Sequence, residues 1–201
     1  MRVFLKIITY LFYPLFIPIY GTLIYFLVTK KYTSFEMQIG NLLPIFILTV
    51  VIPSICFIIL QNVGMIKSIL MKTTEERKYP IYICISLFFL IVYKVIPNNY
   101  TSELYYYFIG LIIGLFTTLA LLFINFKSSL HMLGIGSLVM YLISLSIHFE
   151  INITISISIL IALTGLIASS RLYFKAHKKI EVLGGLLIGI ISQFITLSYW
   201  L

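Results

Sequence analysis

The sequence predicts an all-α membrane protein, a polytopic bundle of about six to seven transmembrane helices. Of its 201 residues, 61% are hydrophobic and only 10% are charged, and the mean hydropathy is +1.11. A hydrocarbon core about 30 Å thick needs roughly 20 apolar residues per helical crossing, and roughly seven such runs follow one another along the chain. The alternation of polar and apolar residues that is typical of barrel strands is missing outside residues 152–158. The fold class is therefore helical.

The apolar runs give the expected helices in order. They cover residues 3–29, 41–71, 80–97, 103–126, 131–149, 151–172 and 182–200. The first run has a basic start, as a signal peptide has, but it is too long and lacks a small-residue cleavage site, so we expect a retained helix bent at Pro14 and Pro18. The second run is long enough to tilt, or to continue as an interfacial turn beyond Gly64. The boundary between the fifth and sixth runs depends on residues 148–150 alone.

Composition also limits the domain organisation and the partners. We expect one transmembrane domain over 1–201, with a peripheral N-terminal helix and loop at 1–40 and a helical core at 41–201. The net charge is +8, but the basic residues stand at the ends of apolar runs, which favours the bilayer surface or anionic headgroups over nucleic acid as a partner. The chain has no cysteine pair at ligand spacing, no His-Glu-x-x-His motif and few carboxylates, so no metal or other cofactor is expected.

Three polar clusters carry nearly all of the side chains that are capable of chemistry: "MKTTEERKYP" at 71–80, "FKSSLH" at 126–131 and "SSRLYFKAHKKIE" at 169–181. An even number of crossings separates each cluster from the next, so all three are predicted to lie on one membrane face, the cluster face. On this topology the cluster face carries Arg2, Lys6, Lys67, Lys72, Arg77, Lys78, Lys127, Arg171, Lys175, Lys178 and Lys179, and the opposite face carries Lys30, Lys31 and Lys94. The positive-inside rule explains this asymmetry and places the cluster face in the cytoplasm.

Positive charge alone does not explain the histidines. The chain has three, and two of them, His131 and His177, fall in the second and third clusters. Imidazole is largely neutral at pH 7 and is well suited to proton transfer or nucleophilic attack, so its placement favours a shared catalytic site. His148, near Glu150 on the opposite face, is expected to be an interfacial residue.

The third cluster resembles a known signature. Ser170-Arg171, five residues, His177, three residues and Glu181 is similar to the third motif of the type 2 phosphatidic acid phosphatase superfamily, the membrane lipid phosphatases related to vanadium haloperoxidases. Glu181 stands where that motif has Asp, and the carboxylate is kept. His177 and Glu181 are four residues apart, so on a helix they share one face and can hydrogen-bond.

The other two clusters resemble the remaining motifs of that superfamily in weaker form. Ser129 and His131 match the Pro-Ser-Gly-His motif, in which Ser128 replaces Pro and Leu130 replaces Gly. In the first cluster, Lys72 and Pro80 match the Lys, six residues, Arg-Pro motif, while Tyr79 occupies the Arg position. Arg77 or Lys78 is then expected to supply the missing cation from a neighbouring turn.

This resemblance implies a divergent, bacterial-type, metal-independent phosphatase of the inner membrane that hydrolyses a lipid phosphate or diphosphate monoester through a phosphohistidine. It implies that His177 attacks phosphorus, that Glu181 orients it, and that His131 protonates the departing oxygen. Arg171, Arg77, Lys72 and Ser129 are then the expected phosphate-binding residues. Bacterial members of the superfamily usually act on the outer side, in conflict with the charge asymmetry, so the orientation stays open.

A different class of function is also compatible with the weak first and second motifs. The alternative is a catalytically inactive relative that binds anionic lipid headgroups or a membrane partner. A small transporter is a third reading, but neither intramembrane charges nor broken helices in matching halves of the chain support it.

Overall fold

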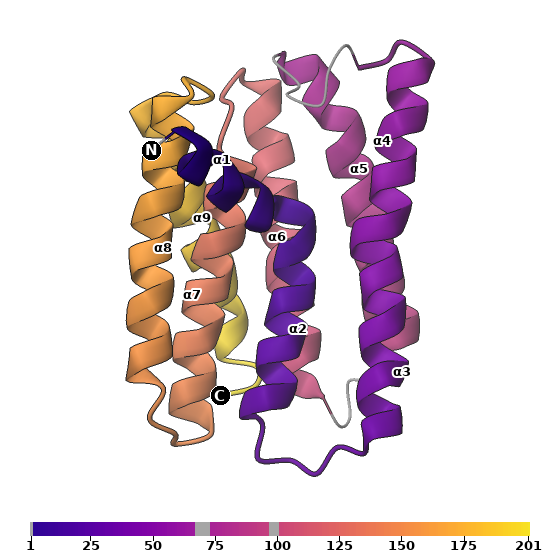
Figure 1. Cartoon of the computed structure of the whole chain (residues 1–201). Coiled ribbons are helices and arrows are strands. Elements are labelled where there is room, and N and C mark those ends of the chain that lie inside the picture. The colour runs from indigo at the N-terminus through magenta and orange to yellow at the C-terminus, as the bar shows by residue number, and fades with distance from the viewer. Residues whose placement is uncertain (1, 67–72, 97–100) are drawn as a thin grey trace.

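The computed structural model describes residues 2–66, 73–96 and 101–201, and within them all regular structure is helical. The elements are α1 (Arg2–Leu11), the 3-10 turn η1 (Pro14–Phe16), α2 (Ile17–Val28), α3 (Phe35–Phe46), the π-helical turn η2 (Ile47–Val51), α4 (Ile52–Asn62), α5 (Thr74–Leu90), the π-helical turn η3 (Ile91–Val95), α6 (Ser102–Phe123), α7 (Leu130–His148), α8 (Thr154–Tyr173) and α9 (Lys179–Leu197). They form an all-α bundle of roughly parallel and antiparallel helices (Figure 1).

Joined across their turns, these elements give seven segments in the described part of the chain that are long and apolar enough to cross a membrane. The segments are Arg2–Val28, Phe35–Asn62, Thr74–Val95, Ser102–Phe123, Leu130–His148, Thr154–Tyr173 and Lys179–Leu197. Each overlaps one of the seven predicted runs. The chain is a multi-pass membrane protein, and the predicted fold class is confirmed.

Prolines shape the first two segments. Pro14 ends α1 and starts η1, because the preceding Tyr13 is held in an extended conformation (φ −64°, ψ 140°). The predicted bend is therefore present at Pro14, and α1 runs obliquely across the bundle instead of continuing the axis of α2 (Figure 1). Pro18, the other predicted position, lies in the first turn of α2, where proline fits the helix. In the second segment, Pro53 has no N–H to donate to the carbonyl of Thr49, and the π-helical η2 lies at this point.

The second segment begins earlier than its apolar run. Ser34 caps α3, and its hydroxyl accepts a hydrogen bond from the backbone N–H of Met37 at 3.2 Å. The helix therefore starts at Phe35, before the predicted position 41. It ends at Asn62, followed by Gly64 with φ 82°. The predicted continuation from 67 to 71 lies outside the described residues.

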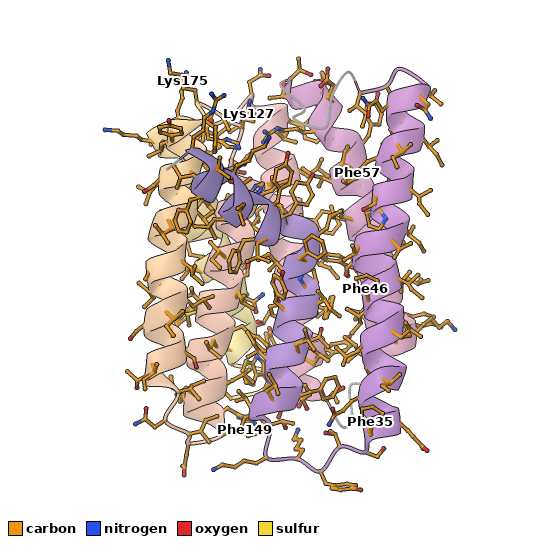
Figure 2. The ribbon with its side chains drawn as sticks, in the orientation of Figure 1. Phe35, Phe46, Phe57, Lys127, Phe149 and Lys175 are labelled. Atoms are coloured by element: carbon orange, nitrogen blue, oxygen red, sulfur yellow. The ribbon has the colours of Figure 1, made fainter. Side chains whose placement is uncertain are left out.

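The three polar clusters meet at one end of the bundle, the cluster end, which is uppermost in Figure 1. The start of α5, the α6–α7 connection and the α8–α9 connection all lie there. Figure 2 shows Lys127 and Lys175 at this end and Phe35 and Phe149 at the other. The prediction that the clusters share one face is confirmed for the described residues 73–80, 126–131 and 169–181.

α7 packs closely against α9. A Cβ atom on Gly189 would overlap the backbone carbonyl of Leu133, and one on Gly185 would overlap that of Ser129. The two helices approach closely because both positions lack side chains, as in other small-residue membrane interfaces. The same contact brings the start of α7 against the start of α9.

The N-terminal segment contributes to this core. Ile17 and Tyr25 of α2 are buried, and the hydroxyl of Tyr107 on α6 donates a hydrogen bond to the carbonyl of Ile17 at 3.1 Å. α2 packs against α7 and α1 against α8. The division of the chain at residue 40 remains a prediction, but the helices before it pack within the same bundle.

Candidate functional site

The third cluster forms the connection from α8 to α9. α8 ends at Tyr173, and Lys175 takes a left-handed conformation with φ 50°, which reverses the chain. α9 then begins at Lys179 with Glu181 in its first turn. The carboxylate of Glu181 accepts a hydrogen bond from the backbone N–H of Lys178 at 2.9 Å, which fixes the start of the helix.

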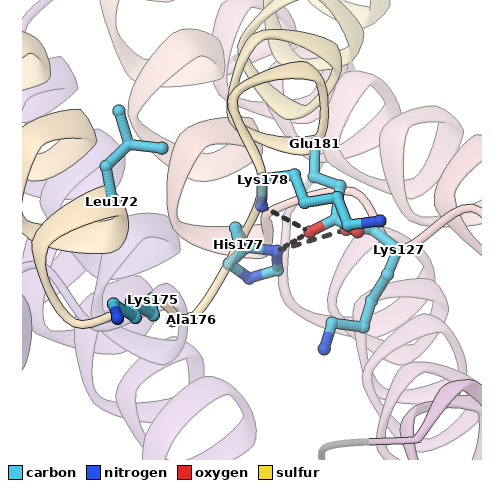
Figure 3. A pocket seen from close by; sticks show the side chains of 7 residues that line it. All are labelled: Lys127, Leu172, Lys175, Ala176, His177, Lys178 and Glu181. Carbon is cyan, nitrogen blue, oxygen red and sulfur yellow. Dashed lines mark hydrogen bonds and ion pairs between the residues drawn. The ribbon is translucent and has the colours of Figure 1, made fainter.

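The same carboxylate orients His177. Glu181 Oε2 lies 3.1 Å from Nδ1 of His177, and the carbonyl oxygen of Lys127 lies 3.2 Å from the same nitrogen (Figure 3). A carbonyl oxygen can only accept, so the geometry places the ring proton on Nδ1. In the neutral ring, Nε2 then carries the lone pair. This is the arrangement that an imidazole nucleophile requires.

The surroundings of His177 favour its neutral form. Burial, followed by the nearby charge of Arg77, lowers the pKa of His177 from 6.5 to about 4, while the hydrogen bond to Glu181 acts in the opposite direction. Burial, followed by the charge of Arg77, also lowers the pKa of Lys127. His177 is therefore an unprotonated base at neutral pH.

A pocket of about 320 Å³ opens beside this pair. Its lining residues, shown in Figure 3, are Lys127, Leu172, Lys175, Ala176, His177, Lys178 and Glu181. Three of them are lysines, so the pocket is basic and suits an anionic ligand. The predicted nucleophile and its carboxylate both line the pocket.

The second cluster lies directly against the third. The backbone N–H of Ser129 donates to the carbonyl of Glu181 at 3.0 Å, which ties the start of α7 to α9. Ser129 is fully buried and His131 is 9% exposed. Within the described residues, Ser129 Oγ and His131 Nε2 have no hydrogen-bond partner. His131 is close enough to interact electrostatically with Arg171 and His177.

Arg171 reaches the same region from the last turn of α8. It is 7% exposed, and its Nη2 donates to the hydroxyl oxygen of Thr9 on α1. Its Nε has no partner among the described residues. The neighbouring Ser170 contacts α1 as well, with its hydroxyl 2.6 Å from that of Thr9.

The first cluster contributes one cation within the described residues. Arg77 Nη1 donates to the carbonyl of Ser128 at 3.4 Å, so Arg77 faces the second cluster. Lys78 instead pairs with Glu75 at 2.6 Å and lies 4.5 Å from the ring centroid of Phe123. Of the two alternatives for the missing cation, Arg77 is the one that reaches the site. Lys72, the remaining predicted phosphate-binding residue, lies outside the described residues.

Two residues of the N-terminal segment were missed by the sequence reasoning. Thr9 contacts Arg171, and the ring of Tyr13 packs edge-on against His131 with centroids 5.5 Å apart. Nothing in the local sequence signals these contacts, because they join positions more than a hundred residues apart. α1 and the turn after it are thus part of the site.

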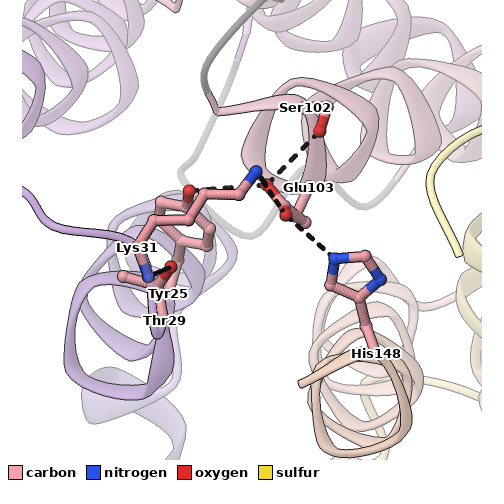
Figure 4. Close-up of polar contacts among 6 residues, drawn as sticks. All are labelled: Tyr25, Thr29, Lys31, Ser102, Glu103 and His148. Atoms are coloured by element: carbon pink, nitrogen blue, oxygen red, sulfur yellow. Dashed lines mark hydrogen bonds and ion pairs between the residues drawn. The ribbon is translucent and has the colours of Figure 1, made fainter.

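A second polar network lies at the opposite end of the bundle. Glu103, in the first turn of α6, is fully buried and lies 2.7 Å from Lys31 Nζ and 3.1 Å from His148 Nε2 (Figure 4). The hydroxyl of Tyr25 also donates to this carboxylate, at 3.4 Å. His148, expected to be an interfacial residue, is therefore part of an ion-paired network. An acidic residue just inside an apolar run is the sequence signal that could have revealed it.

Comparisons of the chain with family models, with curated proteins and with solved structures found no match. Among the described residues, no group of His, Cys, Asp and Glu side chains is arranged to hold a metal ion. The chemistry of the site is therefore inferred from its own residues.

Proposed function

We propose that this chain is a metal-independent phosphatase that hydrolyses a lipid phosphate or diphosphate monoester through a phosphohistidine. In this proposal it is a divergent member of the type 2 phosphatidic acid phosphatase superfamily and acts in a bacterial inner membrane. The observation that carries the proposal is the fixed ring of His177. Its Nδ1 faces two acceptors, Glu181 and the Lys127 carbonyl, and its second nitrogen is left for attack beside a basic pocket.

In the proposed reaction, Nε2 of His177 attacks phosphorus, and the bond from phosphorus to the oxygen of the lipid alcohol (or lipid phosphate) breaks. His131 donates a proton to that departing oxygen. A water molecule then gives a proton to His131 and attacks the phosphohistidine, which releases phosphate and restores the free ring. Glu181 holds the Nδ1 proton and offsets the positive charge that His177 carries while it is phosphorylated.

Cations hold the phosphoryl oxygens in this proposal. Arg171, Arg77 and Lys127 converge on the two histidines from α8, α5 and the α6–α7 connection. Guanidinium groups bind phosphate through paired N–H donors and offset the charge that spreads over its oxygens in the transition state. Ser129 and Lys72 are proposed as further phosphate ligands.

The placement of the site supports a lipid as the substrate. The basic pocket lies at the end of a membrane-spanning bundle, where a phosphate headgroup can enter while its acyl or prenyl chain stays in the bilayer (Figures 2 and 3).

One observation favours the alternative, an inactive relative that binds anionic headgroups. His131 and Arg171 are both more than nine-tenths buried, and a residue of α1 already engages Arg171. In that case anions would bind at the outer pocket without hydrolysis.

The test is phosphate release from a panel of lipid phosphates and diphosphates by purified protein with chelator and without added metal. We expect release by wild type and its loss in His177→Ala. Lys175→Ala is the matched control, since Lys175 lines the same pocket but has no role in bond breaking, and it should reduce affinity without abolishing turnover. Full turnover by His177→Ala would refute the assigned role. Binding without release by a well-folded wild type would support the alternative.

A further inference from the structure

The helix α1 covers the part of the site that is most deeply buried. It meets α8 through hydrogen bonds of Ser170 and Arg171, and the turn that follows it meets α7 through Tyr13 and His131. The ring of His131 also interacts with the backbone of Thr9. α1 therefore stands between the surface of the bundle and two predicted site residues, the catalytic His131 on α7 and the phosphate-binding Arg171 on α8.

Beneath α1 the polar groups are incompletely satisfied. Ser129 Oγ, His131 Nε2 and Arg171 Nε are all buried and have no hydrogen-bond partner within the described residues. Buried polar atoms without partners are uncommon and destabilising, so three in one region indicate a place for a ligand rich in hydrogen-bonding groups. All three of these groups are hydrogen-bond donors or can be, so the ligand that fits best is an oxyanion.

The Thr9 hydroxyl occupies part of that place. The Thr9 hydroxyl oxygen accepts the hydrogen bond from Arg171 Nη2 and lies 2.6 Å from Ser170 Oγ. A neutral oxygen therefore occupies the position next to the guanidinium that an oxyanion would favour. The exchange of a neutral acceptor for a charged one strengthens the hydrogen bond. This favours displacement of Thr9 by an anionic ligand.

α1 is also held to the bundle by few buried side chains, so it can move away from it. It is a separate ten-residue helix in which only Leu5 and Ile8 are buried. Phe12 and Tyr13 follow it outside any helix, ahead of Pro14. Its apolar side chains on the outer side are exposed, Phe4 by 54% and Ile7 by 59%, and Lys6 adds a positive charge. An amphipathic helix of this kind is stable at a bilayer interface, so it can leave the bundle without being exposed to bulk water.

We propose that α1 is a lid over the phosphate site, closed in this structure by Thr9, and that an oxyanion headgroup displaces Thr9 from Arg171 as the lid opens. The proposal rests on the proposed function, because it assigns that phosphate site its regulation. It adds Thr9 as the residue that engages Arg171 while the lid is closed. Binding of a headgroup then includes the cost of opening α1, which lowers the apparent affinity.

The test compares Thr9→Val with wild type in full-length protein in lipid nanodiscs. Valine keeps the volume of threonine but removes the hydroxyl that Arg171 engages. The first readout is the rate at which diethyl pyrocarbonate labels His131, followed by mass spectrometry, with His148 at the far end as the internal reference. The second readout is the affinity for tungstate, used as a phosphate analogue. Neither readout requires turnover.

We expect Thr9→Val to label faster at His131 and to bind tungstate roughly 10-fold more tightly, because a hydrogen bond to a charged group contributes at least that factor to an equilibrium. Thr164→Val is the matched control: Thr164 and Thr9 both donate to the carbonyl four residues earlier, at 2.9 and 3.0 Å, but only Thr9 contacts Arg171. Thr164→Val and the conservative Thr9→Ser should behave like wild type. Unchanged labelling of His131 or unchanged tungstate affinity in Thr9→Val would overturn the proposal.

A second measurement on wild type covers the case in which Thr9→Val does not fold. Amide hydrogen exchange in α1 should be much faster than in α2, and tungstate should accelerate it further. Exchange in α1 as slow as in α2 would show a fixed helix and contradict a lid. The two proposals fail separately: absence of lipid phosphate hydrolysis counts against the proposed function, while the labelling of His131 still reports whether α1 opens.

Discussion

At the scale of single residues, the chemistry depends on one imidazole ring whose two nitrogens have different surroundings. Nδ1 of His177 faces Glu181 and the Lys127 carbonyl, and burial keeps the ring neutral, with a pKa of about 4. A neutral ring with its proton fixed on Nδ1 differs from a surface histidine in both tautomer and charge. Both differences can be measured.

The lowered pKa predicts the acid limb of the pH profile. His177 loses its lone pair on protonation, so turnover should be retained as the pH falls below 6.5 and should decline near pH 4. The slope of kcat/KM against pH, measured between pH 3.5 and 8 on an active lipid phosphate, checks this. A limb near pH 6.5 that belongs to His177 would contradict the buried, neutral ring.

Arg77 should influence that limb. Its positive charge is the second cause of the lowered pKa of His177, after burial. Arg77→Gln should therefore raise the acid limb toward, but not to, pH 6.5, and it should also weaken phosphate binding. Lys78→Gln is the control, because Lys78 pairs with Glu75 away from the site. An identical shift in both variants would indicate a general effect of surface charge instead.

The negative charge of Glu181, and not only its shape, should contribute to turnover. Glu181→Gln keeps an acceptor for the Lys178 N–H but loses the negative charge beside His177, and we expect turnover to fall by roughly 10²–10⁴-fold, as when the orienting carboxylate of a catalytic triad is neutralised. Glu181→Asp keeps the charge and should lose much less. Comparison of kcat for the two variants decides whether the charge or the shape of residue 181 matters more. Equal losses of kcat in both variants would contradict an electrostatic role.

At the scale of elements, most of the fold could be predicted from the sequence. In the described part of the chain, the seven apolar runs correspond to seven segments that are long and apolar enough to cross a membrane, because a helix that crosses a bilayer must be long and apolar regardless of its neighbours. The ends of the runs were less predictable. The start of α3 at Phe35 depends on the hydrogen bond of its cap Ser34, and the π-helical turn η2 depends on Pro53. Neither feature changes the hydropathy of the run.

The glycines of α9 give a prediction at this scale. Gly189→Ala places a Cβ against the carbonyl of Leu133 and should separate α9 from α7, with a loss of about 1–3 kcal/mol of stability. Gly165→Ala on α8 is the matched control, because a Cβ there meets nothing within 4 Å. It should be neutral or slightly stabilising. Thermal unfolding in one detergent compares the two, and equal stability would contradict the close α7–α9 packing.

At the scale of the whole molecule, the bundle carries a polar network at each end. The sequence predicted the grouping at the cluster end, because an even number of crossings returns each cluster to the same face. It did not predict the position of α1, since the contact between Thr9 and Arg171 depends on how the bent first segment packs on α8. It also missed Glu103, whose partners come from the α2–α3 connection and the end of α7.

The network around Glu103 should hold the far end together without taking part in the chemistry. Glu103→Gln removes the buried charge that Lys31 pairs with, while the Lys31 side chain is 34% exposed and can be solvated, so we expect a loss of about 1–3 kcal/mol of stability, as for a lost hydrogen bond to a charged group. The residual folded protein should keep its pH profile. Glu75→Gln, at an ion pair whose carboxylate side chain is 75% exposed, should change stability by less than about 1 kcal/mol. A Glu103→Gln variant as stable as wild type would contradict this assignment.

The central claim is that His177 is the covalent nucleophile, and the most direct test is to trap the phosphorylated protein. The protein is mixed with a lipid phosphate labelled in its phosphoryl group and quenched within milliseconds under alkaline denaturing conditions that preserve phosphohistidine. Mass spectrometry then locates the label. The proposed mechanism predicts a phosphoryl group on His177 in wild type, none in His177→Ala, and more of it in His131→Ala if hydrolysis of the intermediate then limits turnover. Release of phosphate with no label on His177, or a label on another residue, would contradict the proposed mechanism.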